Sequence, residues 1–402
     1  MKKVFITIKK FKMSIIILFI GGYAFLSVSF VDNYFEVSKN LDIFATMFRE
    51  LNIYYVDETN PGDLMKKGMD NMLESLDPYT NYIPESEIED FRYMTTGQYG
   101  GVGALIRQQG DYVVISEPYE GYPAQKADLR AGDKILQINE INAKGKKTED
   151  ISKILKGQAS TIVKLIIERE GESKPLEKTL NREEIKIKSV PYSGMLTKNV
   201  GYIKLTGFTD NAAKEVKDAL LELKKNSDLK SVVFDLRGNP GGLLKEAVDI
   251  VNIFAEKNTE IVSTRGKVKE WDKVHRALYA PVDLTIPVAV LIDKGSASAS
   301  EIVSGSFQDL DRGVIIGQKS YGKGLVQQTR PLSYNAQLKV TVAKYYTPSG
   351  RCIQALDYSR RNKNGVVSKV ADSLISEFKL SLIHISEPTR LRRISYAVFC
   401  LK

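Results

Sequence analysis

The sequence predicts an α/β protein that carries an inserted β-domain and a small helical region ahead of it. From about residue 180, apolar strand-like runs alternate with helical runs, a pattern typical of a largely parallel sheet covered by helices. Residues 97–170 instead contain short β-rich runs separated by glycine turns, and residues 40–96 alternate helical patches with polar turns. We therefore expect a helical region at 40–96, a β-domain at 97–170 and an α/β core at 180–380.

Residues 1–30 have the features of an export signal or membrane anchor. Five lysines lie within the first twelve residues, and the apolar run MSIIILFIGGYAFLSVSF follows them. This run of eighteen residues is long for a cleaved signal, barely long enough to span a bilayer, and followed by no clear small-x-small cleavage site. We expect an uncleaved anchor in preference to a cleaved signal. The body would then lie outside the cytoplasm, in the periplasmic part of the cell envelope, anchored in the inner membrane.

The formal charge of +9 is concentrated at the two ends of the chain and leaves about +1 on the body. No basic stripe with interleaved aromatic residues occurs in the body, so we expect no nucleic-acid partner. The chain has only two cysteines and two histidines, and the histidines lack metal-ligand spacing. We expect no disulfide framework, no metal site and no histidine-based catalytic triad.

Residues 381–402 differ abruptly in composition from the preceding chain. SLIHISEPTRLRRISYAVFCLK resembles translated sequencing-adapter read-through, and the alternative is a basic, poorly ordered tail. We expect an artefact, in which case the core at 180–380 is truncated.

Glycines precede an apolar strand in the β-domain, at YGGVGALI. Further along, PAQKADLRAGDKILQINEINAKG predicts a short helix, a Gly-Asp turn and a paired strand. Together these segments resemble a PDZ domain, although a glycine turn in an unrelated small β-domain is an alternative. The resemblance implies that the backbone N–H groups of Gly101, Val102, Gly103 and Ala104 bind a peptide's C-terminal carboxylate while the peptide adds a strand to the sheet.

Two strand-to-helix turns in the core have unusual compositions. FDLRGNPGGLL ends a buried strand in glycines, which allow close approach of the backbone to a ligand, although such turns are often merely tight connections. VLIDKGSASASEIVSGSFQD places three serines before a helix, as a nucleophile requires. Helix capping by a serine and Glu301 is the structural alternative. Capping explains one serine, but not the alanines that keep space open around the middle hydroxyl.

GQKSYGKG nearly matches a phosphate-binding loop, but Gly324 stands where that loop needs a hydroxyl residue. We therefore expect no nucleotide. Because histidine is excluded, lysine is the remaining base for a serine nucleophile, provided that burial lowers its pKa. Lys323 fits this role, and in an extended chain Gln327 would share its face and could orient the amine.

The combination of GSASASEI, SYGKGLVQ, DLRGNPGG and a PDZ-like insert resembles the carboxy-terminal processing (tail-specific) peptidase family, over roughly residues 40–379. The resemblance implies a Clp-protease/crotonase-like core, no cofactor, Ser298 as nucleophile, Lys323 as general base and Gln327 as its support. It also implies an oxyanion hole from the N–H groups of Ala299 and either Gly241 or Gly242.

The function predicted from this resemblance is that of an exported serine endopeptidase that cleaves envelope proteins near their C-termini. Its partners would be proteins or peptides with free C-termini, recognised by the PDZ-like domain, and the membrane through the N-terminal segment. The alternative is a catalytically inert PDZ-containing adaptor of the cell envelope, and a nucleotide-binding protein is a weaker one.

Overall fold

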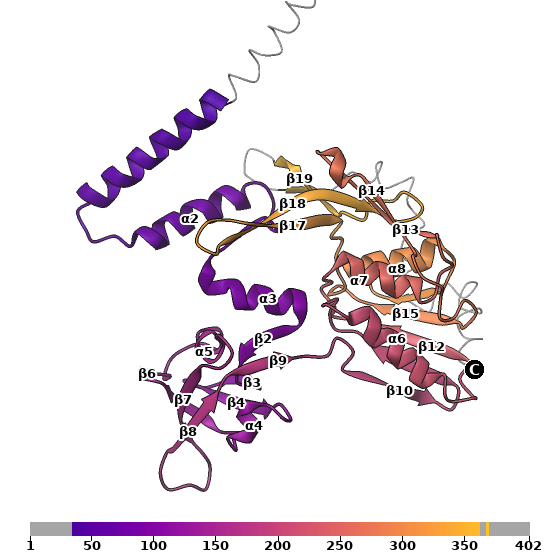
Figure 1. Ribbon diagram of the computed structural model, residues 1–402, viewed down its shortest axis with the longest axis horizontal. Coiled ribbons are helices and arrows are strands. Elements are labelled where there is room, and N and C mark those ends of the chain that lie inside the picture. The colour runs from indigo at the N-terminus through magenta and orange to yellow at the C-terminus, as the bar shows by residue number, and fades with distance from the viewer. Residues whose placement is uncertain (1–33, 362–366, 370–402) are drawn as a thin grey trace, which may run out of the picture. The chain divides into compact units, whose positions relative to one another are not determined.

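The computed structural model describes residues 34–361 and 367–369 (Figure 1). The expected signal or anchor at 1–30 and the expected artefactual tail at 381–402 lie outside these residues. Among the described residues, no helix has both the length and the apolar character needed to cross a membrane. The chain divides into two units between Asn71 and Met72.

The first unit is helical. A helix covers residues 34–54, and α2 (Pro61–Glu74) begins after it. The side chain of Asn60 caps the start of α2, because its Oδ1 accepts the N–H groups of Gly62 (3.0 Å) and Asp63 (3.3 Å). Pro61 at the first helical position needs no N–H partner, which suits this start.

The β-domain of the second unit is a six-stranded antiparallel sheet in the order β3-β4-β5-β7-β8, with β6 paired to β5. Its core is aliphatic and includes Val113, Ile135 and Leu165, none of which is exposed. The strands are β3 (Ala104–Gln109), β4 (Tyr112–Pro118), β5 (Lys134–Ile138), β6 (Ile141–Asn142), β7 (Ile162–Glu168) and β8 (Leu176–Asn181), and the helices are α4 (Pro123–Lys126) and α5 (Thr148–Leu155). Strand β3 forms one edge of the sheet, and β8 lies beyond residue 170.

Two strands and a helix flank the β-domain. β2 (Gln98–Gly101) enters it and β9 (Glu183–Lys186) leaves it, and the two pair antiparallel. Helix α3 (Ile88–Thr96) precedes β2 and ends at Gly97, whose φ of 70° is the left-handed conformation common at helix ends.

The α/β core contains a five-stranded sheet in the order β10-β11-β12-β15-β16, in which the last four strands run parallel. Its apolar strands, such as Ser231–Asp235, are buried, as expected for a parallel sheet under helices. The strands are β10 (Tyr192–Thr197), β11 (Val200–Lys204), β12 (Ser231–Asp235), β15 (Val288–Ile292) and β16 (Val314–Gly317), and the helices are α6 (Ala212–Leu223), α7 (Leu244–Asn252) and α8 (Ala299–Asp309). The predicted alternation of strand and helix is confirmed.

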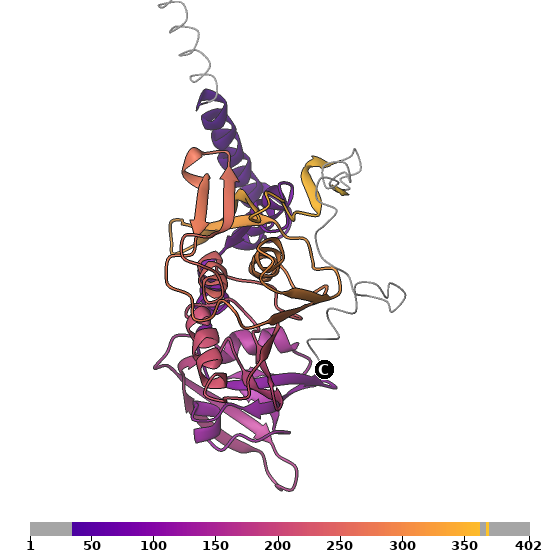
Figure 2. The same cartoon turned by 90° about the vertical axis from the view of Figure 1, so that its right-hand side faces the viewer.

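A second, antiparallel sheet accompanies this core (Figures 1 and 2). It runs β1-β18-β13-β14, and β17 also pairs with β18. Its members are β1 (Asn81–Ile83), β13 (Glu260–Gly266), β14 (Lys273–Arg276), β17 (Leu325–Pro331) and β18 (Gln337–Tyr346), while the short helices η1 (Glu85–Glu87) and η2 (Lys269–Trp271) and the hairpin β19 (Leu356–Arg361) and β20 (Val367–Lys369) complete the elements. Strand β1 brings residues near 80 beside β18, far along the chain.

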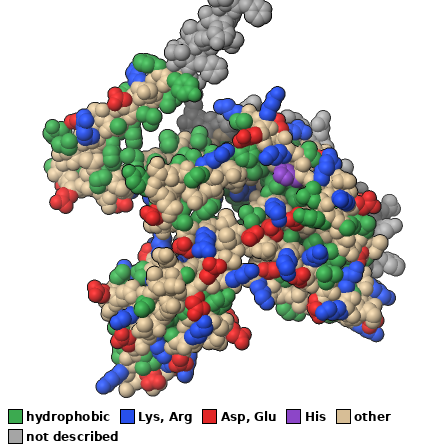
Figure 3. Space-filling model, in the orientation of Figure 1, with side chains coloured by type: hydrophobic (Ala, Val, Ile, Leu, Met, Phe, Trp, Pro, Cys, Tyr) green, Lys and Arg blue, Asp and Glu red, His purple; other side chains and the backbone are tan. Residues whose placement is uncertain are grey.

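Acidic and basic side chains are interspersed on the face of the molecule seen in Figure 3. This distribution agrees with the nearly balanced charge of the body of the sequence.

Gly317 ends β16 at a position where no side chain fits. Its φ is 131°, and a Cβ built there would overlap the carbonyl oxygen of Ile292, its partner in β15. The first glycine of the near phosphate-loop motif therefore serves strand pairing. Only glycine fits at position 317, because the backbones of β15 and β16 approach each other too closely there for a Cβ.

We predict that Gly317→Ala lowers the free energy of unfolding by about 3 kcal/mol, because the overlap involves backbone that cannot move aside. Gly171→Ala is the matched control, since Gly171 also has a positive φ (88°) but nothing lies within 4 Å of its built Cβ. The control should lose about 1 kcal/mol. Equal losses in urea unfolding would contradict the steric explanation.

Candidate active site

Three turns at the carboxyl ends of neighbouring parallel strands carry the candidate catalytic residues. We name them the glycine turn (236–243, after β12), the serine turn (293–298, after β15) and the lysine turn (318–324, after β16). Strands β12, β15 and β16 are adjacent and parallel, so their carboxyl ends meet at one edge of the sheet. This is the edge at which open α/β folds place their sites.

Asp293 joins the serine turn to the glycine turn. Its Oδ1 accepts the N–H groups of Gly238 and Gly295, both at 2.9 Å. Burial opposes ionisation of Asp293, but these N–H donors hold the pKa of its carboxyl below the usual value. The Ala297 N–H also donates to the Asn239 carbonyl at 3.1 Å, which gives the two turns a fixed spacing.

Ser296 and Ser298 of the serine turn and Ser300 at the start of α8 have different environments. Ser296 Oγ donates to the Leu236 carbonyl (2.8 Å) and Ser300 Oγ to the Asn239 carbonyl (2.9 Å), and both residues are fully buried. Ser298 is partly exposed; its side chain faces the Glu301 N–H as in a capping box, and no group among the described residues accepts a hydrogen bond from its hydroxyl. The outer serines are therefore structural, and the middle serine is available for chemistry.

The backbone of Ser298 is strained. Its φ of 55° and ψ of −112° place it at the N-cap of α8 in a conformation that residues with a side chain rarely adopt. Such strain at a strand-to-helix turn is typical of nucleophiles that are presented on a sharp bend.

Glu301 connects Ser298 to the lysine turn. It is only 3 % exposed, and its carboxylate accepts four hydrogen bonds. The donors are the N–H groups of Ser298 (2.8 Å), Gly322 (2.6 Å) and Lys323 (2.9 Å) and the Ser320 hydroxyl (2.7 Å). Burial raises the pKa of Glu301, and the four donors oppose this effect. The capping role expected of Glu301 is thus one part of a wider bridge.

Tyr345 makes a second bridge between the same two turns. Its hydroxyl donates to the carbonyl groups of Ser298 (3.1 Å) and Lys323. Tyr345 is on β18 and is fully buried, so the second sheet also sets the spacing between Ser298 and Lys323.

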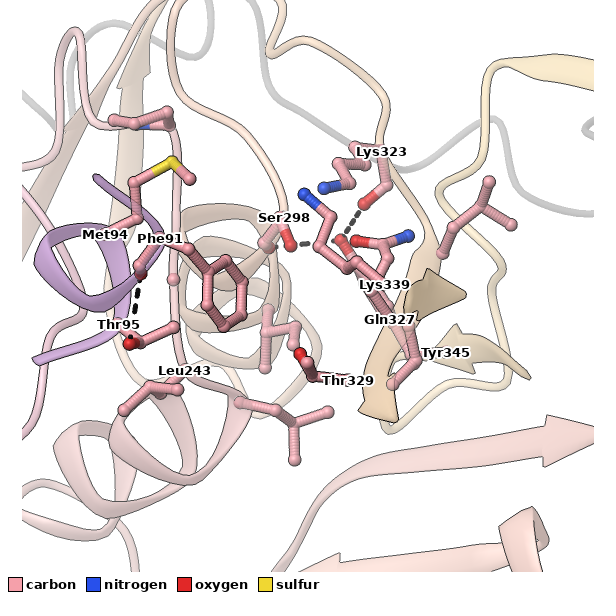
Figure 4. A pocket seen from close by; sticks show the side chains of 16 residues that line it. Phe91, Met94, Thr95, Leu243, Ser298, Lys323, Gln327, Thr329, Lys339 and Tyr345 are labelled. Atoms are coloured by element: carbon pink, nitrogen blue, oxygen red, sulfur yellow. Dashed lines mark hydrogen bonds between the residues drawn. The ribbon is translucent and has the colours of Figure 1, made fainter. Parts of the chain in front are cut away.

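Lys323 lies with its ammonium over the ring of Tyr79, 4.4 Å from the ring centroid. Burial and, to a smaller extent, the charge of Lys339 lower the pKa of Lys323 to about 8, and Asp77 and Glu301 act in the opposite sense. No hydrogen bond joins Ser298 Oγ to Lys323 Nζ in the described part of the chain. The two groups nevertheless line one pocket (Figure 4).

Gln327 also lines this pocket, but its side chain bonds elsewhere. Its Nε2 donates to the Thr341 hydroxyl at 3.4 Å, and no bond to Lys323 occurs among the described residues. Strand β17 begins at Leu325, and its pairing with β18 shifts between Val326 and Gln327. Because of this bulge, the simple alternation used to relate Gln327 to Lys323 does not apply.

The glycine turn lies against the serine turn. The Gly241 N–H donates to Asn239 Oδ1 at 2.9 Å, whereas among the described residues the N–H groups of Gly242 and Ala299 have no hydrogen-bond partner. A Cβ on Gly241 would come within 2.6 Å of the Ala297 carbonyl oxygen, and one on Gly242 would overlap the Phe208 carbonyl. Gly242 lines the pocket with Ser298, and Gly241 does not.

Much of the remaining wall of the pocket is apolar, although Thr95, Thr329 and Lys339 also line it. Figure 4 shows Phe91 and Met94 of α3 and Leu243 of the glycine turn beside Ser298. Leu244, Ile302 and Val326 extend this surface. If the carbonyl group of a bound peptide lay at Ser298, an apolar side chain of that peptide could pack against this surface.

The predicted carboxylate-binding loop lies between β2 and the edge strand β3. The carbonyl groups of Val102 and Gly103 accept the N–H groups of Ala124 (2.7 Å) and Tyr119 (2.8 Å), while the N–H groups of Val102 and Gly103 have no partner in the described ranges. Gly103 has a φ of 71°, which favours glycine. Gly101 ends β2, and Ala104 begins the open edge of the sheet.

Several residues of the site carry no separate signal in the sequence. Lys339 and Tyr345 come from β18, and Tyr79 comes from the segment before β1. Their pattern in the sequence is that of ordinary strand and turn residues, and only the pairing of β1, β17 and β18 brings them to Lys323.

Protein-family models match two parts of the chain. The model of peptidase family S41 matches residues 199–359, and a PDZ-domain model matches residues 114–169. A carboxy-terminal-processing protease of Bartonella bacilliformis is 36 % identical over 354 residues, which are 85 % of this chain and 80 % of that protein.

Two further similarities are more partial. A probable CtpA-like serine protease of Staphylococcus aureus is 35 % identical over 317 residues, 78 % of this chain and 62 % of that protein, so this chain spans less than two thirds of that relative. The solved structure of a photosystem II D1 C-terminal processing protease is 28 % identical, with coverage of 78 % of this chain and 89 % of that chain and a TM-score of 0.45.

The resemblance and the PDZ domain inferred from the sequence are thereby confirmed, as is the assignment to serine peptidases. The chain belongs to the carboxy-terminal-processing proteases of peptidase family S41 and contains a PDZ domain.

Proposed function

We propose that this chain is an exported endopeptidase that cleaves envelope proteins near their C-termini, with Ser298 as nucleophile and Lys323 as general base. The observation that carries the proposal is the pocket shared by these two side chains. No group among the described residues accepts a hydrogen bond from the Ser298 hydroxyl, and the pKa of Lys323 is lowered to about 8. A neutral amine beside a free hydroxyl is what proton abstraction requires.

The reaction would begin with a rotation of the Lys323 side chain from the Tyr79 ring toward Ser298. The neutral amine takes the Ser298 proton as Oγ bonds to the scissile carbonyl carbon. The resulting ammonium then gives its proton to the leaving amine as the peptide bond breaks. A water molecule, deprotonated by the same amine, hydrolyses the acyl-enzyme and frees Ser298.

The N–H groups of Ala299 and Gly242 are our candidates for stabilising the oxyanion. Both lack other hydrogen-bond partners in the described ranges, and Gly242 lines the pocket. Gly241 is the weaker candidate of the two glycines because its N–H already donates to Asn239. Donors aimed at the developing negative charge lower the barrier most when they need no reorganisation.

The PDZ domain would bind the substrate's C-terminus at the loop from Gly101 to Ala104. The open edge of β3 can accept a peptide as an added strand, and the loop's N–H groups can bind the terminal carboxylate. The complete sheet includes β8, so we place this domain at residues 98–186. Export and membrane anchoring are proposed from residues 1–30.

We predict that Ser298→Ala and Lys323→Met each reduce cleavage of a tail peptide by about 10³-fold or more, and that the double variant loses little beyond either one. Lys323→Arg should also fail, since guanidinium stays protonated. Lys319→Met is the control, because Lys319 is exposed in the same turn. Near wild-type cleavage by Lys323→Arg would exclude a general-base role.

If Ser298 and Lys323 form a catalytic dyad, we expect kcat/KM to rise with pH. Neutral amine is the active form, so activity should increase through an apparent pKa near 8, the value lowered by burial. An unperturbed lysine would place this rise near pH 10.4, about two units higher. An inert adaptor would show no cleavage at any pH, and Ser298 would not react with a fluorophosphonate probe.

Glu301→Gln should lower both stability and kcat. In the wild type, both oxygens of Glu301 accept hydrogen bonds. In the variant an NH₂ group replaces one oxygen and faces donors with which it cannot bond, so the free energy of unfolding should fall by about 2 kcal/mol. Glu222→Gln is the control, since Glu222 is exposed on α6. If kcat and urea stability were both unchanged in Glu301→Gln, the four-donor bridge would not hold the two turns.

For the PDZ domain, we predict that the full chain carrying Ser298→Ala binds peptides with a free apolar C-terminus about tenfold more tightly than their C-terminal amides. The carboxylate is needed because the loop offers N–H donors to an anion. Fluorescence anisotropy with matched labelled peptides measures the difference. Equal affinity for acid and amide would exclude a carboxylate-binding loop.

A further inference from the structure

A second lysine, Lys339, lines the same pocket as Ser298 and Lys323 (Figure 4). It lies near the start of β18 and is paired in the backbone with Asn81 of β1 on one side and Thr329 of β17 on the other. Because strands hold it on both sides, its side chain leaves the sheet from a fixed position. Lys339 takes no part in the proton transfers proposed for Ser298 and Lys323.

Both lysines lack a carboxylate partner. Within the described residues, neither Lys323 Nζ nor Lys339 Nζ has a carboxylate oxygen at ion-pair distance. Asp77 and Glu301 are the acidic groups that face Lys323, but their oxygens are occupied. Asp77 accepts the N–H groups of Tyr79 (2.8 Å) and Thr80 (2.9 Å), and Glu301 accepts its four donors.

The charged and titratable groups around Lys323 can be named element by element. The segment before β1 supplies Asp77 and Tyr79, α8 supplies Glu301, β18 supplies Lys339 and Tyr345, and Tyr321 lies in the lysine turn itself. Lys339 is the positive member of this set. Two like charges in one partly buried pocket repel each other, and repulsion favours the neutral form of one of them.

We propose that Lys339 is a positioning residue for this reaction, whose ammonium in the shared pocket disfavours a second positive charge and so keeps the Lys323 amine neutral and able to accept the serine proton. The proposal rests on the dyad proposed above. It agrees with the direction of the electrostatic effect, since Lys339 lowers the pKa of Lys323. Lys339 itself is buried enough that its pKa is also lowered, chiefly by desolvation. Lys323 lies in the turn that Glu301 ties to Ser298, so its proton is the one that matters for Ser298.

The test measures the protonation of Lys323 directly, without relying on catalysis. Trace acetylation of the full chain at a series of pH values, followed by mass spectrometry of the peptide that contains Lys323, gives the pKa of its amine. Lys339→Met should raise that pKa by about one unit. Lys339→Arg keeps the charge and should leave the pKa at the wild-type value. Lys344→Met is the matched control, because Lys344 is an exposed lysine on the same strand and lies outside this pocket.

The pH profile of tail-peptide cleavage is the second readout. In Lys339→Met the rise of kcat/KM should move to higher pH by the same amount as the acetylation pKa, with roughly tenfold less activity at pH 7. A merely structural defect would lower activity at every pH and leave the midpoint unchanged. If Lys339→Met does not fold, Lys339→Gln serves in its place, since it keeps a polar end and removes the charge.

The outcomes separate this inference from the proposed function. An unchanged acetylation pKa of Lys323 in the charge-removing variant would overturn the role of Lys339, whatever the dyad does. Full cleavage by Lys323→Met would overturn the dyad, even if the acetylation pKa shifted. A raised KM for acidic peptides with no change in either midpoint would instead make Lys339 a substrate-binding residue and would also overturn this inference.

Discussion

The buried carboxylate of Glu301 is the interaction on which the geometry of the site depends. It gathers the backbone of Ser298 and the backbone of the lysine turn around one anion, through four donors in all. A buried carboxylate is tolerated only when its oxygens are satisfied, so the donors and the acceptor hold one another in place. Apart from it, the described residues join the serine and lysine turns through the Tyr345 hydroxyl and through the Tyr321 N–H, which donates to the Ser296 carbonyl at 3.0 Å.

The parallel sheet makes such a bridge possible. Adjacent parallel strands end at one edge, so groups 61 residues apart in sequence, such as the Asn239 carbonyl and the Ser300 hydroxyl, can hydrogen-bond directly. The turns approach so closely that Gly241 and Gly242 leave no room for a Cβ. The glycines therefore belong to the packing of the turns as much as to any contact with a substrate.

The second sheet adds the electrostatics. Strand β18 contributes Tyr345 and Lys339, and the segment before β1 contributes Tyr79 and Asp77. Around Lys323 lie an aromatic face, the carboxylates of Asp77 and Glu301, which accept other hydrogen bonds, and the ammonium of Lys339, which has no ion-pair partner among the described residues. Burial and the nearby positive charge of Lys339 both favour the neutral form of the Lys323 amine, while the Tyr79 ring makes a cation–π contact with its protonated form.

The sequence by itself determined the strand-helix alternation, the PDZ-like glycine loop and the two motifs that contain Ser298 and Lys323, because these depend on local periodicity and on which residue types occur at short spacing. Which of the three serines is free could be inferred only through the family resemblance, since capping and catalysis use the same residue type. The tertiary structure decided the rest. The Gly241 N–H donates to Asn239, whereas the Gly242 N–H has no partner in the part of the chain that the structure describes. The fold also makes Glu301 a bridge and brings Tyr79 and Lys339 to Lys323. The approach of Tyr79 and Lys339 depends on strand pairing between distant segments, such as Asn81 with Lys339, and the direction of Gln327 depends on a bulge; neither leaves a local pattern in the sequence.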